Sequence, residues 1–258
     1  MRTSPRDTFR PGARSLGTWV KLAGPESVEI MAFAGFDFVV LDLEHAPLDL
    51  SATFASVSLA DALGLTPLVR VPDHAPSTIQ KVLDMGAHGL VVPRVQDGGQ
   101  AAAVARAFSF PPAGTRGAGS TSRAGRWGTL PPDEYVADGR DRALLVVQVE
   151  SAAAVAAADE IAAVPEVGGI LLGSADLALD LGVGPGDAAV SAAVSAVRET
   201  ARAHGRLFGL AHGADPEAVR TGLDAGNDFA LVANDTTFLA TAARAAVTAV
   251  RASEKRHA

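Results

Sequence analysis

Two acidic residues, Glu150 and Asp176, are the first candidates for chemistry because each follows a short apolar run. The runs are residues 144–149 and 169–172, with one helical segment between them. Two carboxylates together with water suit a hard divalent cation, which prefers oxygen ligands and keeps positions open for a substrate. The alternative is that Asp176 caps the next helix and Glu150 forms a surface ion pair. The spacing alone leaves both interpretations open.

A second group of ionisable side chains lies at the end of the apolar run 38–43, where Asp42, Glu44 and His45 follow closely on one another. An imidazole could accept or donate a proton there near neutral pH. The alternative is a structural hydrogen-bond network around a buried histidine. Arg70 ends the next apolar run, and its guanidinium would bind either a carboxylate of the protein or an anionic substrate.

Short apolar runs alternate along the chain with longer Ala-rich segments of helical spacing, which predicts strand and helix units. The predicted strands are residues 18–22, 38–43, 67–71, 89–92, 144–149, 169–172, 207–210 and 229–232. The predicted helices are residues 25–34, 50–62, 77–85, 99–108, 152–163, 188–203, 216–225 and 236–250. Because the strands are apolar throughout, both faces of the sheet are expected to lie under helices. The pattern predicts one α/β domain over residues 1–258, a (β/α)8 TIM barrel.

This fold determines where the candidate side chains would meet. In such barrels the reactive residues project from the carboxyl ends of the strands. Asp42, His45, Arg70, Glu150 and Asp176 all stand at the end of a predicted strand or in the turn that follows. We therefore expect one active site at one end of the barrel.

Two segments depart from the alternation. Residues 1–14 mix Arg, Pro, Thr and Asp, and we expect them to form a poorly ordered extension. Residues 109–142 are rich in Gly and Pro and are predicted to form a long loop. The arginines of this loop, with Trp127 and Tyr135, favour an ordered functional loop over a spacer.

Composition limits the classes of function. The formal net charge is −7, and no basic cluster is present, which argues against binding of nucleic-acid phosphates. No apolar stretch approaches the ~20 residues that cross a bilayer, and residues 1–14 lack the apolar core of a signal peptide. Cysteine is absent, which excludes disulfides and thiolate metal sites and is compatible with the cytoplasmic location that we predict. The expected partners are small molecules, without nucleic acid or membrane.

Several motifs in order along the chain resemble the metal-dependent class II 2-oxo acid aldolases, of the 4-hydroxy-2-oxoheptanedioate or 2-keto-3-deoxy-sugar-acid type. The resemblance extends from about residue 17 to the last predicted helix and rests on residues 35–38, 42–45, 69–72, 83–87, 111–117, 148–150 and 173–177. It implies a barrel of the phosphoenolpyruvate/pyruvate type and a divalent metal, Mg²⁺, Mn²⁺ or Co²⁺. It also implies reversible cleavage of a 4-hydroxy-2-oxo acid into pyruvate, or a similar 2-oxo acid, and an aldehyde.

The resemblance further implies roles for individual residues. Glu150 and Asp176 would hold the metal. Asp42, His45 and Arg70 would form the catalytic group, with Arg70 against the developing enolate oxygen and His45 as the proton carrier. The substrate would contact Arg70, Gln148, and the backbone amides around Gly173, Ser174 and Ala175, where a helix begins.

Asp84 stands where the family has an acidic partner of the catalytic histidine, yet it ends a predicted helix. A helix end belongs at the barrel end opposite the active site, so Asp84 would reach a histidine only in a neighbouring subunit. This predicts a homo-oligomer. The alternative is a solvated aspartate at the end of a helix.

Three positions depart from the family pattern. Ser174 stands where Pro is frequent, Ala46 where Gly is usual, and Gly169 where an acidic residue is frequent. The first two would touch the wall of the site and could change which substrate fits.

Two alternatives to the aldolase stay open. One is a related metal-enolate reaction, either decarboxylation of an oxaloacetate-type acid or cleavage of an acyl thioester, and the other is a non-catalytic barrel subunit.

Overall fold

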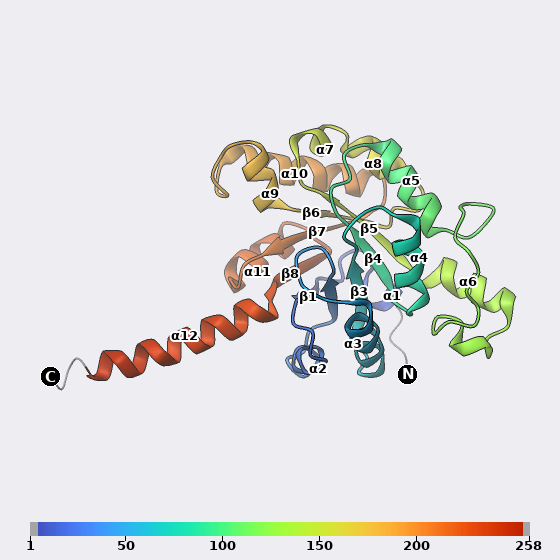
Figure 1. The fold of residues 1–258 in the computed structure, drawn as a ribbon. Helices are drawn as coiled ribbons and strands as arrows, with labels where there is room; N and C mark the ends of the chain where they lie inside the picture. Colours follow the sequence, from blue (N-terminus) through green and yellow to red (C-terminus); the bar gives the residue numbers. More distant parts are fainter. Residues whose placement is uncertain (1–4, 255–258) are drawn as a thin grey trace.

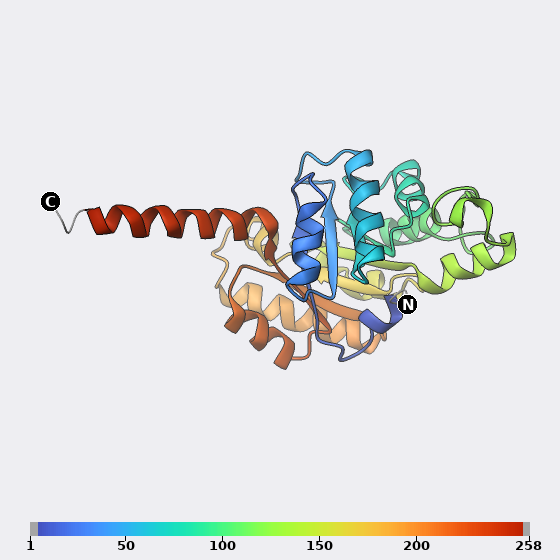
Figure 2. The same ribbon diagram turned by 90° about the horizontal axis from the view of Figure 1, so that it is seen from below.

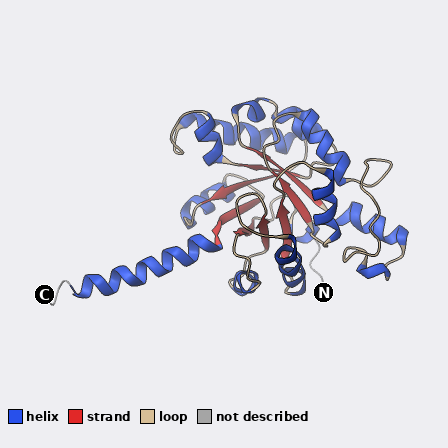
Figure 3. Cartoon of the chain, viewed as in Figure 1, coloured by secondary structure: helices blue, strands red, loops and turns tan. Residues whose placement is uncertain are grey.

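Eight parallel strands form a closed barrel with helices around it in the computed structural model, which describes residues 5–254 (Figures 1 and 3). The strands are β1 (Ser15–Val20), β2 (Phe38–Asp42), β3 (Thr66–Arg70), β4 (Gly89–Val92), β5 (Leu144–Val149), β6 (Gly169–Leu172), β7 (Leu207–His212) and β8 (Phe229–Asn234). Each strand pairs with the next one along the chain, and β8 pairs with β1. The predicted (β/α)8 barrel is therefore confirmed.

Five of the outer helices begin at a capping side chain. Asp49, Asp97, Ser151, Asp187 and Asp215 each accept a hydrogen bond from an amide of the following first turn. The helices are α2 (Glu26–Phe33), α3 (Leu50–Ala62), α4 (Pro76–Asp84), α5 (Gly98–Phe108), α7 (Ala152–Ala156), α8 (Ala158–Ala163), α9 (Ser174–Asp180), α10 (Ala188–Ala203) and α11 (Pro216–Asp224).

The inside of the barrel is filled by large side chains that two strand glycines accommodate. A Cβ atom on Gly17 would lie 2.3 Å from the ring of Phe38, and one on Gly209 would lie 2.1 Å from the ring of Phe229. Any larger residue would displace these fully buried rings. The two glycines are therefore needed for the packing of the barrel interior. Because glycine has no apolar side chain, they also weaken the run of apolar residues from which a strand is predicted.

The amino-terminal segment closes the barrel at the amino ends of the strands. Helix α1 (Pro5–Thr8) precedes Phe9, whose ring is buried 4.8 Å from Phe38 and 5.7 Å from Phe229, measured between ring centroids. The expected poorly ordered extension is therefore wrong for residues 5–14, because one aromatic side chain packs into the open end of the core. Residues 1–4 lie outside the described residues.

The predicted long loop also needs correction. Residues 109–131 are largely irregular, with one short 3-10 helix, η1 (Arg126–Gly128), but α6 (Pro132–Arg142) is a regular helix. Tyr135 anchors α6 with its ring 5.3 Å from that of Phe110. Most of the other side chains of α6 are polar or charged, so no apolar stripe indicates a helix there.

The last helix, α12 (Asp235–Glu254), leaves the barrel and points away from it (Figures 1 and 2). Its first turn is held by the ring of Phe238, which lies 6.3 Å from that of Phe36. From Leu239 through Ala252 every residue is exposed. No helix among residues 5–254 is long and apolar enough to cross a membrane.

Candidate active site

The predicted site residues converge at the carboxyl ends of the strands, apart from Asp84. Asp42 and Arg70 end β2 and β3, where they occupy paired positions of the sheet. Glu150 follows β5, and Asp176 lies in the first turn of α9 after β6. A cavity of about 410 Å³ opens here. Its lining residues are Glu44, His45, Arg94, Gln96, Glu150, Ser151, Asp176, Leu179 and Asp180.

Asp42 and Arg70 form a buried ion pair in parallel geometry. Arg70 Nε donates to Asp42 Oδ1 at 2.9 Å, and Arg70 Nη2 donates to Oδ2 at 2.7 Å. Lys21 Nζ lies 3.1 Å from the same carboxylate, and the guanidinium stacks 4.1 Å above the ring of Trp19. Burial opposes the negative charge, but the hydrogen bonds and charge of Arg70 outweigh it and lower the pKa of Asp42 to about 2. Asp42 is therefore a fixed carboxylate that holds Arg70 in place.

Glu44 lies near Arg70, Arg94 and His45. Its carboxylate lies 3.3 Å from Arg70 Nη1, 3.3 Å from Arg94 Nε and 3.7 Å from His45 Nε2. The side chain of His45 is 59% exposed, so the alternative of a buried structural histidine is wrong. Asp42 does not contact this ring; it accepts hydrogen bonds from the backbone amides of Glu44 and His45, each at 3.1 Å. The turn is thus fixed while the imidazole faces the opening.

Glu150 is a buried carboxylate bound by uncharged donors. Its Oε1 accepts the backbone N–H of Arg94 at 2.8 Å, and its Oε2 accepts the side-chain amide of Gln148. Burial raises the pKa of Glu150, and the negative charges of Asp176 and Glu44 act in the same direction, against the hydrogen bond from Arg94. The surface ion pair considered for Glu150 is therefore wrong.

The donor set fits a divalent cation. Gln148 Oε1 is buried beside Glu150 without a hydrogen-bond partner in the described part of the chain. Such an acceptor is costly unless a ligand or its water donates to it. Within residues 5–254 no cluster of three or more His, Cys, Asp or Glu ligands occurs. Glu150 and Asp176 would thus supply two oxygens and leave the other positions to water and substrate, as Mg²⁺ prefers.

The turn before α9 is built differently from what the sequence predicts. The N–H of Gly173 donates to the carbonyl of Val149 at 2.9 Å, so this amide is not available to a substrate. Instead Gly173 provides space, because its Cβ would lie 3.0 Å from Glu150 Cβ and 3.1 Å from Gln148 Nε2. No side chain of residues 5–254 caps the start of α9, which leaves the amides of Ser174 and Ala175 as the predicted carboxylate donors.

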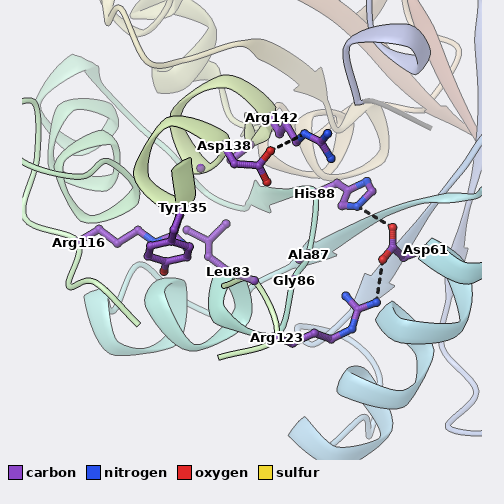
Figure 4. Close-up of a pocket in the computed structure, with 13 residues that line it drawn as sticks. Asp61, Leu83, Gly86, Ala87, His88, Arg116, Arg123, Tyr135, Asp138 and Arg142 are labelled. Atoms are coloured by element: carbon purple, nitrogen blue, oxygen red, sulfur yellow. Dashed lines mark hydrogen bonds and ion pairs between the residues drawn. The ribbon is translucent and has the colours of Figure 1, made fainter. Parts of the chain in front are cut away.

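Asp84 lies at the other end of the barrel and is not brought to His45 of its own chain. It ends α4, accepts a hydrogen bond from the Tyr135 hydroxyl at 3.3 Å, and lies 3.5 Å from Arg116 Nη2. Arg116 and Tyr135 line a small pocket beside it (Figure 4). The role of Asp84 in a neighbouring subunit stays a prediction.

Two residues at the mouth received no role from the sequence. Glu44 belongs to a recognised motif, and Arg94 follows the fourth predicted strand. Arg70 is identified as a charged residue at the end of a strand. Arg94 would be identified in the same way if the turn after the fourth strand were included. A further charged residue, Lys21, lies within the first predicted strand, residues 18–22. In the structure it is an ion-pair partner of Asp42.

Comparison with known proteins identifies the family to which this chain belongs. The chain is 38% identical over 249 residues to the hydroxypyruvate/pyruvate aldolase of Roseovarius nubinhibens, which covers 93% of this chain and 95% of that protein. It is 34% identical to the 4-hydroxy-2-oxo-heptane-1,7-dioate aldolase of Salmonella paratyphi C, and this match covers 95% of this chain and 93% of that protein.

A solved structure of an HpcH/HpaI aldolase/citrate lyase family protein from Burkholderia cenocepacia J2315 superimposes with a TM-score of 0.88. It shares 31% identity with this chain, and the match covers 96% of this chain and 98% of that one. The family model for HpcH/HpaI aldolase/citrate lyase matches residues 15–242. The predicted resemblance is confirmed, and the chain belongs to the HpcH/HpaI aldolase/citrate lyase family.

Proposed function

We propose that this enzyme is a divalent-metal-dependent aldolase that reversibly cleaves 4-hydroxy-2-oxo acids into pyruvate, or a similar 2-oxo acid, and an aldehyde. The strongest support is the arrangement of Glu150, Asp176 and the unpartnered Gln148 Oε1, at the same barrel end as the Arg70 and Asp42 pair. The relatives described above are named as aldolases.

The proposed reaction needs two proton transfers and the formation of one carbon–carbon bond. In the synthetic direction the methyl group of pyruvate loses a proton, and the enolate carbon attacks the aldehyde carbonyl carbon. A carbon–carbon bond forms, the aldehyde C=O becomes a C–O single bond, and its oxygen takes up a proton. Cleavage is the reverse. A divalent cation held by Glu150 and Asp176 would stabilise the negative charge that develops on the 2-oxo group.

The protein side chains divide the remaining work. Asp42 occupies Arg70 Nε and one N–H of Nη2, so other N–H groups of the guanidinium remain for the enolate oxygen. His45 lies at the rim of the same cavity and would move the proton, directly or through a water. The amides of Ser174 and Ala175 would bind the carboxylate of the 2-oxo acid.

The test is hydrogen–deuterium exchange at the methyl group of pyruvate, followed by NMR, which needs no aldehyde. We expect exchange with Mg²⁺, Mn²⁺ or Co²⁺, its loss with excess chelator, and a decrease on the order of 100-fold or more in Glu150→Gln, because a metal ligand is lost. Glu199→Gln, on an exposed position of α10, is the matched control. Metal-independent exchange, or none, would contradict the proposal.

Product analysis then separates aldol cleavage from the two related reactions. A 4-hydroxy-2-oxo acid should yield equal amounts of a 2-oxo acid and an aldehyde. The alternatives would be favoured if another reaction were fastest. These reactions are release of CO₂ from an oxaloacetate-type acid and cleavage of an acyl thioester into a smaller thioester and a carbonyl compound. The cytoplasmic location predicted from the composition remains part of this proposal.

We also propose that the working form is a homo-oligomer in which α12 packs on a second copy of the chain. Leu239, Val247 and Val250 are exposed on α12, and at 3.6 residues per turn they lie along one side of it. Phe33 and Ile30 of α2 are also exposed, by 76% and 59%. Full burial of one such side chain contributes roughly 1.5–3 kcal/mol. A neighbouring subunit would also supply the Asp84 that this chain does not bring to its own His45.

Sedimentation velocity tests the oligomer. We expect the wild-type chain to sediment as an oligomer at micromolar concentration, and the double variant Val247→Asp/Val250→Asp to dissociate. Thr248→Asp is the control, because Thr248 lies on the opposite side of α12 from Leu239. A wild-type monomer with full aldolase activity would rule out both the oligomer and a role for Asp84 across an interface.

A further inference from the structure

Arg94 occupies a distinctive position at the mouth of the barrel. It follows β4 and lines the same cavity as Glu150 and Asp176. Of the residues that line this cavity, Arg94 is the only Lys or Arg, whereas Glu44 and Asp180 add to its acidic side chains. An anion that enters the cavity therefore meets one guanidinium among several carboxylates.

The backbone of Arg94 is held in a conformation that favours glycine. Its φ angle is +54°, and its N–H donates to Glu150 Oε1 at 2.8 Å. Glycine would adopt this left-handed conformation without strain, whereas a residue with a Cβ atom does so at a conformational cost. The backbone contact to Glu150 needs only the N–H, so it does not explain why the side chain is arginine.

The side chain of Arg94 is anchored on one edge only. Nε lies 3.3 Å from Glu44 Oε1, and Nη2 donates to the carbonyl of Pro72 at 3.0 Å. No partner of Nη1 occurs within residues 5–254, and 61% of the side chain is exposed. The guanidinium therefore keeps N–H groups available at the entrance, next to the predicted metal ligand.

We propose that Arg94 selects aldehyde substrates that carry a carboxylate, an inference that rests on the proposed aldolase function. The acidic residues of the cavity repel such a substrate, and a guanidinium offsets this repulsion by binding the carboxylate through paired N–H donors. Because the backbone of Arg94 is tied to Glu150, the carboxylate is bound beside the reacting 2-oxo acid. A neutral aldehyde gains nothing from this contact.

Glyoxylate and glycolaldehyde test the proposal, because they have the same number of carbon atoms and differ in carrying a carboxylate or a hydroxymethyl group. Both are used as acceptors for pyruvate, and the readout is the ratio of their kcat/KM values. In Arg94→Met we expect this ratio, glyoxylate over glycolaldehyde, to fall about tenfold or more, mainly through the KM of glyoxylate, because a charge-assisted contact is lost. Arg94→Lys should retain part of the preference.

Arg220→Met is the matched control, because Arg220 is also 61% exposed and pairs with an acidic residue, Glu217, on α11. Its ratio should equal that of the wild type. Increasing ionic strength should lower the wild-type ratio and leave that of Arg94→Met almost unchanged.

A ratio in Arg94→Met equal to that of the wild type would overturn the inference. If both kcat/KM values had fallen by the same factor, Arg94 would act only through Glu150. Hydrogen–deuterium exchange at the methyl group of pyruvate, measured without aldehyde, tests the aldolase proposal separately. If the wild type catalyses this exchange but the ratio of kcat/KM values is unchanged in Arg94→Met, only the role of Arg94 is contradicted. If the wild type catalyses no exchange, both the aldolase proposal and the role of Arg94 are contradicted.

Discussion

Two clusters of buried charged side chains occupy opposite ends of the barrel. In the cluster between α3, α4 and α6, Arg123 Nη2 and His88 Nε2 lie 2.7 and 3.2 Å from the carboxylate of Asp61 (Figure 4). At the mouth Asp42 has a similar environment, with Arg70 and Lys21. Glu150, which is buried, and Asp176, which is exposed, differ, because no Lys, Arg or His side chain lies within ion-pair distance of them among residues 5–254.

This difference separates structural charges from functional ones. Removing one member of a buried ion pair leaves an uncompensated charge, so Asp61 and Asp42 are both needed for a stable fold. Burial without a cationic partner raises the pKa of Glu150, and the nearby negative charges of Asp176 and Glu44 add to this shift, so the charged form of Glu150 lowers the stability of the folded chain. Side chains of this kind are typical of sites that bind a cation or perform chemistry.

The largest expected effect comes from breaking either ion pair. Asp42→Ala and Asp61→Ala should each lower the free energy of unfolding by about 3 kcal/mol or more, because a buried or largely buried arginine loses its main carboxylate partner. Urea unfolding at a fixed protein concentration measures this loss. The two variants should differ in chemistry: pyruvate exchange per folded molecule should fall in Asp42→Ala and persist in Asp61→Ala.

Two outcomes would break this comparison. A loss below about 1 kcal/mol in both variants would mean that the pairs are as weak as surface ion pairs. Loss of exchange in folded Asp61→Ala would show that the distant cluster takes part in the reaction.

The second prediction concerns Glu150, whose loss should stabilise the metal-free protein. Since the pKa of Glu150 is raised in the folded state, the folded chain holds its proton more tightly than the unfolded chain. Its stabilising effect is present at low pH and is lost as the pH rises from about 4.5 through the raised pKa. With chelator at pH 7, Glu150→Gln should therefore unfold at a higher urea concentration than the wild type.

Metal should reverse this order. Saturation at 100 times the dissociation constant stabilises a binding protein by about 2.7 kcal/mol, and Glu150→Gln should gain almost none of it. The metal affinity of the wild type should also fall about tenfold per pH unit below the raised pKa, because a proton competes with the cation. A wild type that is more stable than Glu150→Gln in chelator would contradict the assignment of Glu150 as an uncompensated acid.

The sequence predicts the barrel well because its strands are continuous apolar runs that end in polar turns. The predicted ends of strands and helices are less certain where a residue is selected by tertiary packing, because the pattern of apolar residues does not show such contacts. Gly17 makes room for Phe38, and β1 accordingly begins at Ser15 and not at residue 18. Helix α6 is missed because it buries only Tyr135. In each case tertiary contacts, not local preference, determine the element.

The site is predicted at the level of residues but not of atoms. Strand ends identify Asp42, Arg70 and Glu150, yet the pattern cannot show that Asp42 binds the amide of His45 and not its ring. The function of Arg94 depends on a left-handed backbone angle, which no spacing rule indicates for an arginine. Contacts of this kind arise only when distant strands close into one barrel.

The smallest expected effect is that of Gly173→Ala. This variant tests whether the position of Glu150 depends on the absence of a side chain at residue 173. The φ angle of Gly173 is −88°, so alanine fits the backbone without strain. Its Cβ, however, would lie 3.0 Å from Glu150 Cβ, and Glu150 would have to move by a few tenths of an ångström.

Such a shift should weaken metal binding by about tenfold, as is common when a residue that supports a metal ligand is changed. Isothermal titration with Mn²⁺ measures the affinity, and Gly184→Ala is the control, because a Cβ there meets no atom within 4 Å. Equal affinities in Gly173→Ala and the wild type would mean that the hydrogen bonds from Arg94 and Gln148 fix Glu150 by themselves. The difference between the two ends of the barrel would then depend on charge alone and not on the packing around the unpaired acids.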